Sequence, residues 1–228
     1  AGVGTIGMID HDRVDVSNLQ RQVLYDTSDI GQPKVQRASQ RLQGLNPFVK
    51  IEAHEAELSA ANVMQIVSSY DLVLDGTDRF NTRYLSNDAC VLSGKPLISA
   101  AIHRFEGQAM TYVPGAGPCY RCLFPSPPAD GLVPNCAEAG VLGVLPGVMG
   151  VIQATEALKL IVGAGDLLIG RLMTYDALGL RFSEFKFARR SDCAVCGDHP
   201  TIHEPADLPQ LCSAEDLAAV TRVSATAF

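Results

Sequence analysis

DLVLDGTDRFNTRYLSNDACVLSGKPLISAAI, residues 71–102, is a stretch in which two apolar runs flank a helical segment. The runs at 71–74 and 96–102 have the length of buried strands, and residues 81–93 between them have a helical pattern. Strands that alternate with helices form βαβ units, whose strands lie parallel in one sheet. The stretch therefore predicts an α/β fold.

The residues before this stretch continue the alternation. In chain order we predict a strand at about 4–10, a helix at 33–45, a strand at 49–56 and a helix at 59–69. Pro33 is expected in the first turn of its helix, where a missing N–H is tolerated. Ser59 is expected as the N-cap of the second helix.

The residues after this stretch lose the alternation. We predict strands at 107–113 and within 171–186, with a Pro-rich loop at 115–135 and a long buried helix at 145–162 between them. The expected fold class is therefore α/β: a Rossmann-like three-layer fold with a mixed, mainly parallel sheet that antiparallel strands extend.

The domain boundaries follow from the same pattern. Residues 1–197 are expected to form one domain, and 198–228, with little periodicity, a C-terminal arm or linker. Gly2, Gly4 and Gly7 have the G-x-G-x-x-G spacing of a phosphate loop, but no strand precedes them. We therefore expect the domain to lack its N-terminal strand and glycine-rich loop.

Composition excludes several classes of protein. The chain has 228 residues, 47% of them hydrophobic, and a formal net charge of -7, which argues against a nucleic-acid-binding surface. The sequence contains no run of about 18 uninterrupted apolar residues, so it does not indicate a membrane span. The seven cysteines are an odd number, which fits a metal site in a reducing, cytoplasmic setting better than a disulfide framework.

Polar residues gather after the predicted strands. Asp10 ends a strand, where nucleotide-binding folds often place an acid on a ribose hydroxyl. Asn18, Arg21 and Lys34 follow and could face phosphates, and Asp78, after a later strand, is a candidate magnesium ligand. Each residue also has a simpler interpretation as a helix cap or a solvated side chain.

The cysteines divide into two groups. Four of them form two CxxC pairs and are candidate ligands of a structural, tetrahedral four-cysteine zinc site: Cys119, Cys122, Cys193 and Cys196. Cys136 stands apart in a Pro- and Gly-flanked loop and is either a nucleophile or a bystander. Cys90 and Cys212 are expected to be structural.

Together these features resemble the MoeB/ThiF group of ubiquitin-activating-enzyme-like adenylyltransferases, which serve molybdopterin, thiamine or tRNA thiolation. The similarity runs from about residue 1 to 197. It is carried by Asp10, SNLQRQ at 17–22, GQPK at 31–34, Asp78 with Arg83, FEGQ at 105–108, both CxxC pairs, and CAEAGV at 136–141.

The resemblance implies an activity and a set of roles. The activity is adenylation of the C-terminal Gly-Gly carboxylate of a ubiquitin-like sulfur-carrier protein by ATP, with release of pyrophosphate. The implied roles are ribose binding by Asp10, phosphate binding by Asn18, Arg21 and Lys34, magnesium positioning by Asp78 next to Arg79, and thioester or persulfide formation by Cys136.

The resemblance also implies partners and cofactors. ATP, Mg²⁺ and Zn²⁺ are expected, with a homodimer and a cysteine desulfurase or rhodanese as sulfur donor. Arg79 departs from the family, which more often has Asn at this position.

Two other functions stay open at the level of sequence. Asp10 at a strand end would suit an NAD-dependent Rossmann oxidoreductase equally well, but that function leaves SNLQRQ, Lys34 and the CxxC pairs unexplained. A non-catalytic scaffold that binds a ubiquitin-like protein is the other alternative.

Overall fold

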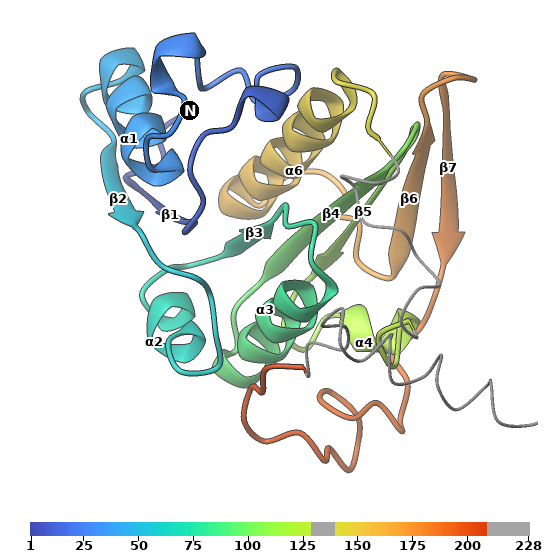
Figure 1. Ribbon diagram of the computed structural model, residues 1–228. Helices are drawn as coiled ribbons and strands as arrows, with labels where there is room; N and C mark the ends of the chain where they lie inside the picture. Colours follow the sequence, from blue (N-terminus) through green and yellow to red (C-terminus); the bar gives the residue numbers. More distant parts are fainter. Residues whose placement is uncertain (129–139, 209–228) are drawn as a thin grey trace, which may run out of the picture.

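The computed structural model describes residues 1–128 and 140–208 (Figure 1). The described strands form a two-stranded sheet, in the order β1-β2, and a five-stranded sheet, in the order β3-β4-β5-β6-β7. Their bounds are Thr5–Ile9 (β1), Lys50–His54 (β2), Val73–Asp75 (β3), Leu97–His103 (β4), Glu106–Tyr112 (β5), Arg171–Asp176 (β6) and Arg181–Lys186 (β7).

The strand directions correct one expectation. β1 pairs with β2 and β3 with β4 in parallel, but the β4–β5, β5–β6 and β6–β7 pairs are antiparallel. The sheet is mixed, as predicted, yet it is not mainly parallel within the described residues. The reason is that β4 and β5, and likewise β6 and β7, are joined without a helix between them, as antiparallel neighbours can be. The long connection between β5 and β6 runs through α6 (Leu145–Val162).

Helices cover both faces of the larger sheet. α3 (Phe80–Ser93) packs its Leu85 and Ala89 in one core cluster with Leu97 and Tyr112, which are partners across β4 and β5. α6 instead packs on Ala100 and Ala109, the partners three residues further along these strands. Because side chains alternate between the faces of a strand, α3 and α6 lie on opposite faces. The three layers predicted from the sequence are therefore present.

Three further helices and two 3-10 turns accompany these elements in the described part of the chain. Their bounds are Val16–Asn18 (η1), Thr27–Asp29 (η2), Lys34–Leu45 (α1) and Val63–Ser68 (α2), with the short α4, Tyr120–Leu123, inside the predicted Pro-rich loop. Two capping expectations were wrong. Pro33 is the N-cap of α1 rather than a first-turn residue.

The second wrong cap is Ser59. α2 begins at Val63 with Asn62 as its N-cap. Asn62 accepts a hydrogen bond from the Ser59 N–H at 2.9 Å and donates one to the Glu57 carbonyl at 2.8 Å. The Asn62 side chain closes a turn over residues 59–62, and this turn delays the start of the helix.

α6 has the predicted bounds but is less buried than expected. By length and composition it could cross a membrane, which is weak evidence because core helices of soluble proteins meet the same test, and 28% of it is buried. Its polar Gln153 and Glu156 are buried, whereas the apolar Val151 and Val162 are mostly exposed. Hydrogen bonds therefore provide part of the contact between α6 and the sheet.

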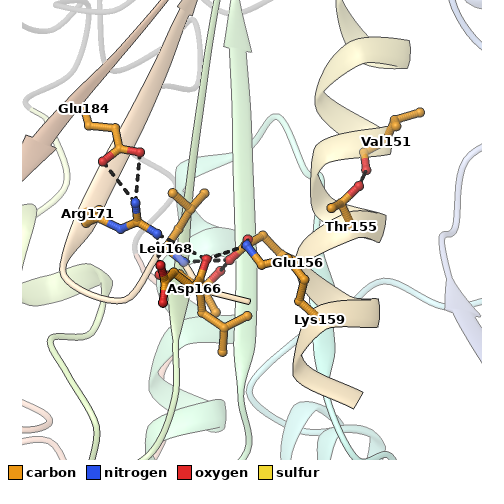
Figure 2. A network of polar contacts seen from close by, with 10 residues as sticks. Val151, Thr155, Glu156, Lys159, Asp166, Leu168, Arg171 and Glu184 are labelled. Atoms are coloured by element: carbon orange, nitrogen blue, oxygen red, sulfur yellow. Dashed lines mark hydrogen bonds and ion pairs between the residues drawn. The ribbon is translucent and has the colours of Figure 1, made fainter. Parts of the chain in front are cut away.

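Glu156 is the centre of one such attachment (Figure 2). Its carboxylate accepts 2.7 Å hydrogen bonds from the Thr111 hydroxyl on β5 and from the Leu168 N–H, and it pairs with Lys159. Arg171 continues the network through the Leu167 carbonyl at 2.7 Å and the Glu184 carboxylate at 3.0 Å. The network ties α6 to β5, which precedes it, and to β6 and β7, which follow it.

The segment after β7 returns beneath α3, at the end of the molecule away from the loops between β1 and α1 (Figure 1). The Asp207 carboxylate accepts a hydrogen bond from the Ala60 N–H at 3.1 Å, and the Leu208 N–H donates to the Asn81 side chain at 2.7 Å. Residues 198–208 therefore lie against the segments that precede α2 and begin α3.

Candidate nucleotide and metal sites

The first group of site residues lies where β1 ends. Asp10 follows the strand, and its carboxylate accepts a hydrogen bond from the Asp12 N–H at 2.8 Å, which turns the chain. Lys34, the first residue of α1, is buried, and its Nζ lies 2.9 Å from the Asp12 Oδ2. The structure therefore places the ammonium group of Lys34 beside the end of β1.

The pKa of Asp12 reflects the positive charges near this position. The hydrogen bond from Lys34 lowers the pKa of Asp12, and the positive charges of Lys34, His11 and Arg79 lower it further against a smaller opposing effect of burial. Arg79 follows β3, so a charge from a second strand end acts on Asp12. Carboxyl ends of strands are where open α/β sheets bind ligands.

Asn18 and Arg21 lie in the excursion between β1 and α1. An isolated bridge between Arg13 and Pro33 closes the base of this loop. The buried Asn18 accepts the Asp15 N–H at 3.2 Å, and Arg21 donates to the Ser17 carbonyl at 2.8 Å. These bonds fix the shape of the loop and leave further donors of both side chains without partners among the described residues.

The same loop packs against the approach to α6. A side-chain carbon at Gly143 would lie 2.5 Å from the backbone oxygen of Gln20 and 2.2 Å from its side-chain oxygen. Residue 143 must therefore be glycine for the backbone to come this close. The contact joins the loop that carries Asn18 and Arg21, which we predicted to face phosphates, to the segment that leads into α6.

The second group of site residues lies where β3 ends. Asp78 is exposed in the loop before α3, and its carboxylate has no hydrogen-bond or ion-pair partner in the part of the chain that the structure describes. Arg79 is the N-cap of α3, and its guanidinium bonds the Glu57 carboxylate at 2.8 Å. Asp78 is therefore free to bind a cation, whereas Arg79 is engaged with an acid.

Sequence reasoning missed the role of Asp12. The strand pattern indicated Asp10, but Asp12 and Lys34 are 22 positions apart, and nothing in the sequence indicated that they pair. The only available signal was the second acid of the D-x-D spacing. The side chains of Asp10, His11 and Asp12 each have an atom that could bind a metal ion, and these atoms lie within 4.8 Å of one another.

The four cysteines of the CxxC pairs come together. Cys119 and Cys122 lie at the start of α4, and Cys193 and Cys196 lie in the turn after β7, with all four sulfurs within 4.8 Å of one another. The Cys119–Cys193 and Cys122–Cys196 sulfur distances are 3.7 and 3.4 Å. Four thiolates about 2.3 Å from one zinc ion would lie about 3.8 Å apart. The cluster therefore fits a tetrahedral metal ion.

Groups around the cluster support this fit. The Arg190 N–H lies 3.4 Å from the Cys122 sulfur, and the Asn87 amide lies 3.9 Å from the Cys119 sulfur. N–H donors stabilise the thiolate form that binds metals. A hydrogen bond from Cys119 lowers the pKa of Cys196 to about 5, whereas burial raises the pKa of Cys122 to about 11.

The structure describes one of the three cysteines outside the CxxC pairs. Cys90 is fully buried, and burial raises the pKa of its thiol to about 12, as expected for a structural cysteine. Cys136 and Cys212 lie outside the described residues.

Comparison with known proteins gives one family. The ThiF family model matches residues 1–195. The sulfur carrier protein adenylyltransferase of Thermus thermophilus is 52% identical over 93% of this chain and 80% of the relative. The SAMP-activating enzyme E1 of Haloferax volcanii is 51% identical over 86% of this chain and 73% of the relative.

Longer relatives and solved structures extend the comparison. The adenylyltransferase and sulfurtransferase MOCS3 of Aedes aegypti is 44% identical over 93% of this chain, which spans 49% of that relative. Among solved structures, E. coli MccB with ATP superimposes with a TM-score of 0.75 at 22% identity, over 86% of this chain and 60% of MccB. At this identity the likeness shows the fold.

Proposed function

Because the chain belongs to the ThiF family, we propose that it adenylates the C-terminal carboxylate of a ubiquitin-like sulfur-carrier protein with ATP and releases pyrophosphate. The observation that carries the proposal is the 52% identity, over 93% of the chain, to a sulfur carrier protein adenylyltransferase. The positions of Asp10 after β1, of Lys34 beside Asp12, and of Asp78 after β3 support it. None of the relatives named above is an oxidoreductase.

The reaction forms one bond and breaks another. A carboxylate oxygen of the carrier attacks the α-phosphorus of ATP, and the bond from that phosphorus to the bridging oxygen of the β-phosphate breaks. Pyrophosphate leaves with the electron pair, and the product is an acyl adenylate. Catalysis of this kind depends on positioning the reactants and neutralising phosphate charge.

The side chains at the two strand ends suit these tasks. In the proposal, Asp10 holds the ribose, and Asn18, Arg21 and Lys34 face the phosphates. Lys34 would exchange its contact with Asp12 for one with a phosphate oxygen. The uncoordinated carboxylate of Asp78 would hold Mg²⁺, which neutralises phosphate charge when bound.

Arg79 belongs to the same site in this proposal, although its contact with Glu57 must loosen for it to reach the nucleotide. Both side chains of this pair are about half exposed, 53% each, and such surface pairs are weak. The contact therefore does not prevent Arg79 from turning toward a phosphate.

The later steps of the pathway are proposals from the family alone. Cys136 would attack the acyl carbon of the adenylate, forming a thioester and releasing AMP, or would carry the outer sulfur of a persulfide received from a cysteine desulfurase or rhodanese donor. The protein would act as a homodimer in the cytoplasm. Zn²⁺ would hold the two CxxC segments together and take no part in the chemistry.

Exchange of labelled pyrophosphate into ATP tests the adenylation step. The full-length protein should catalyse exchange only when a carrier with its C-terminal carboxylate is added. Asp78→Ala should lower the exchange rate by about a hundredfold or more, since it removes the metal-binding charge from the reacting centre.

The matched control is Asp71→Ala, which changes an exposed acid at the other end of β3 and should leave exchange within about twofold. Exchange by Asp78→Ala at the wild-type rate would show that the residue was assigned wrongly. Absence of exchange with every carrier of the source organism would reject the activity itself.

A further inference from the structure

Gln153 is a buried residue in the middle of α6. Its side-chain nitrogen donates two hydrogen bonds, to the carbonyl of Asp75 at 2.8 Å and to the carbonyl of Ile98 at 3.0 Å. Both partners are acceptors, so the nitrogen of the amide faces them and not the oxygen. Asp75 is the last residue of β3, and Ile98 is the second residue of β4. One side chain of α6 therefore binds two neighbouring parallel strands.

The strand end that Gln153 holds leads directly to Asp78. The Asp75 carboxylate accepts hydrogen bonds from the Thr77 N–H at 3.0 Å and from the Thr77 hydroxyl at 2.7 Å, and these bonds turn the chain after β3. Arg83 of α3 donates to the Thr77 carbonyl at 2.7 Å. Because α3 and α6 lie on opposite faces of the sheet, the residues just before Asp78 are held from both faces.

Gly76 gives this support a purpose. Glycine has the widest range of backbone conformations, so the peptide between Asp75 and Gly76 needs contacts from outside to stay in one orientation. A side-chain carbon at Gly76 would lie 3.8 Å from Oε1 of Gln153, so the amide lies next to this residue. The Asp78 carboxylate has no partner among the described residues, and its position therefore depends on the backbone that precedes it.

The segment around α6 also touches the other group of site residues. The loop that carries Asn18 and Arg21 packs its Gln20 against Gly143, two residues before α6 begins. The two groups of site residues follow β1 and β3, which belong to different sheets. Residues 143–153 therefore contact both groups, and Gln153 makes the contact with the second.

We propose that Gln153 is a positioning residue of the adenylation site, which acts through the backbone of residues 75–77 to place the Asp78 carboxylate. The inference rests on the proposed function. Gln153 itself touches neither ATP nor the carrier. A displacement of about 1 Å at a reacting centre can slow a reaction about a hundredfold. The loss of Gln153 should therefore lower the rate of the chemical step and leave the binding of both substrates nearly unchanged.

Steady-state pyrophosphate exchange by the full-length protein gives the first test. Gln153→Met keeps the length of the side chain but removes both hydrogen-bond donations. The kcat should fall about tenfold or more, whereas the KM for ATP and the KM for the carrier should stay within about threefold. Gln153→Asn keeps an amide that is one methylene too short to reach both carbonyls, so its kcat should fall as well. This milder variant decides the test if Gln153→Met does not fold.

Glu156→Gln is the matched control, because it alters another buried polar residue on the same helix. The partners of Glu156 are Thr111 on β5 and Leu168, and none of its contacts involves the end of β3. This variant should lose stability, as Gln153→Met does, yet its kcat should stay within about twofold of the wild type. An equal loss of kcat in both variants would show that α6 acts only through stability and would overturn the inference.

Amide hydrogen exchange measures the same effect without ATP or carrier. The exchange rate of the Thr77 N–H, relative to that of Leu85 in the core of α3, should rise about tenfold or more in Gln153→Met. Glu156→Gln should leave this ratio within about twofold. An unchanged ratio in Gln153→Met, or an unchanged kcat in both Gln153 variants, would overturn the inference. Absence of pyrophosphate exchange in the wild type would instead reject the proposed function, and the Thr77 ratio would still decide whether Gln153 holds the loop.

Discussion

Lys34 is the residue on which the nucleotide site depends most clearly. It is 7% exposed, and its ammonium group pairs with Asp12, an acid that is about half exposed. An almost buried lysine needs a partner, since burial alone disfavours its charge. Asp12 therefore supplies the partner of the Lys34 ammonium group and can release it to a phosphate.

This arrangement predicts the titration of Asp12. The carboxyl should titrate below its usual pKa of 3.8 in the free protein, because the hydrogen bond from Lys34 favours the carboxylate. Lys34→Ala should return the pKa toward 3.8, and addition of a non-hydrolysable ATP analogue should raise it as Lys34 turns to phosphate. Carbon-13 NMR of the carboxyl groups gives the titration curves.

The exposed Asp71 is the internal control for these curves, because it has no charged partner among the described residues. An Asp12 curve that does not move in Lys34→Ala would contradict the pairing. A curve that moves in the variant but not with the ATP analogue would contradict the role of Lys34 at the phosphates.

Some of these residue positions could be predicted and others could not. Asp10 follows β1 and Asp78 follows β3, as the strand pattern predicted, although the two strands belong to different sheets. The Asp12–Lys34 pair arises from a contact between segments that sequence spacing does not bring together. Ser59 was predicted as an N-cap, but a turn over residues 59–62 precedes α2, which begins at Val63.

At the scale of elements, α6 is held by a buried carboxylate. Glu156 is 3% exposed and makes three contacts, with Thr111, Leu168 and Lys159. Burial would raise the pKa of Glu156, but the hydrogen bonds from Lys159, Leu168 and Thr111 lower it overall. The helix pattern predicted the bounds of α6, but not this network, which depends on a β-strand and a loop far along the chain.

The lowered pKa of Glu156 makes part of the stability depend on pH. The contribution should be complete above the usual value of 4.5 and disappear as pH falls through the lower folded-state pKa. At pH 7, Glu156→Gln should lower the free energy of unfolding by about 1–3 kcal/mol, because the donors on Thr111, Leu168 and Lys159 lose their charged acceptor. Below pH 4.5 the difference in the free energy of unfolding between the variant and the wild type should become smaller.

Urea unfolding at the two pH values measures both effects. Glu184→Gln alters a carboxylate that is 45% exposed in the same network, and its effect should stay under about 0.5 kcal/mol. A Glu156→Gln penalty that is equal at both pH values would contradict the account of this carboxylate.

At the scale of the whole molecule, the cysteine cluster joins distant parts of the chain. It connects the segment around α4 with the turn after β7, and three of its cysteines belong to the same core cluster as Leu85 and Val63. The two CxxC pairs predicted that these four cysteines come together. The fold closes the 70 residues between them because β6 and β7 return the chain to the edge of α3.

Removal of one ligand should therefore affect the whole domain. Purified protein should contain about one zinc ion per chain, and Cys193→Ser should lower both the metal content and the melting temperature. Cys90→Ala changes a buried cysteine of the same core cluster that is not a ligand, and it should keep the metal. Metal analysis with thermal unfolding gives both values, and a metal-free wild type would contradict the site.

The order of the strands at this scale was only partly predictable. Helix-linked strands correctly predicted the parallel β3–β4 pair. The antiparallel strands β5 to β7 were recognised as strands, but their share of the sheet was underestimated because strand pairing depends on contacts rather than on local pattern.

The transfer of oxygen from the carrier to AMP tests the central claim most directly. The carrier is prepared with a heavy oxygen isotope in its C-terminal carboxylate, incubated with ATP and the full-length protein, and quenched with hydroxylamine. If the carboxylate attacks the α-phosphorus, the released AMP carries one heavy oxygen and the carrier becomes a hydroxamate. AMP without the isotope, or no AMP with any carrier, would contradict adenylation of the carrier by this protein.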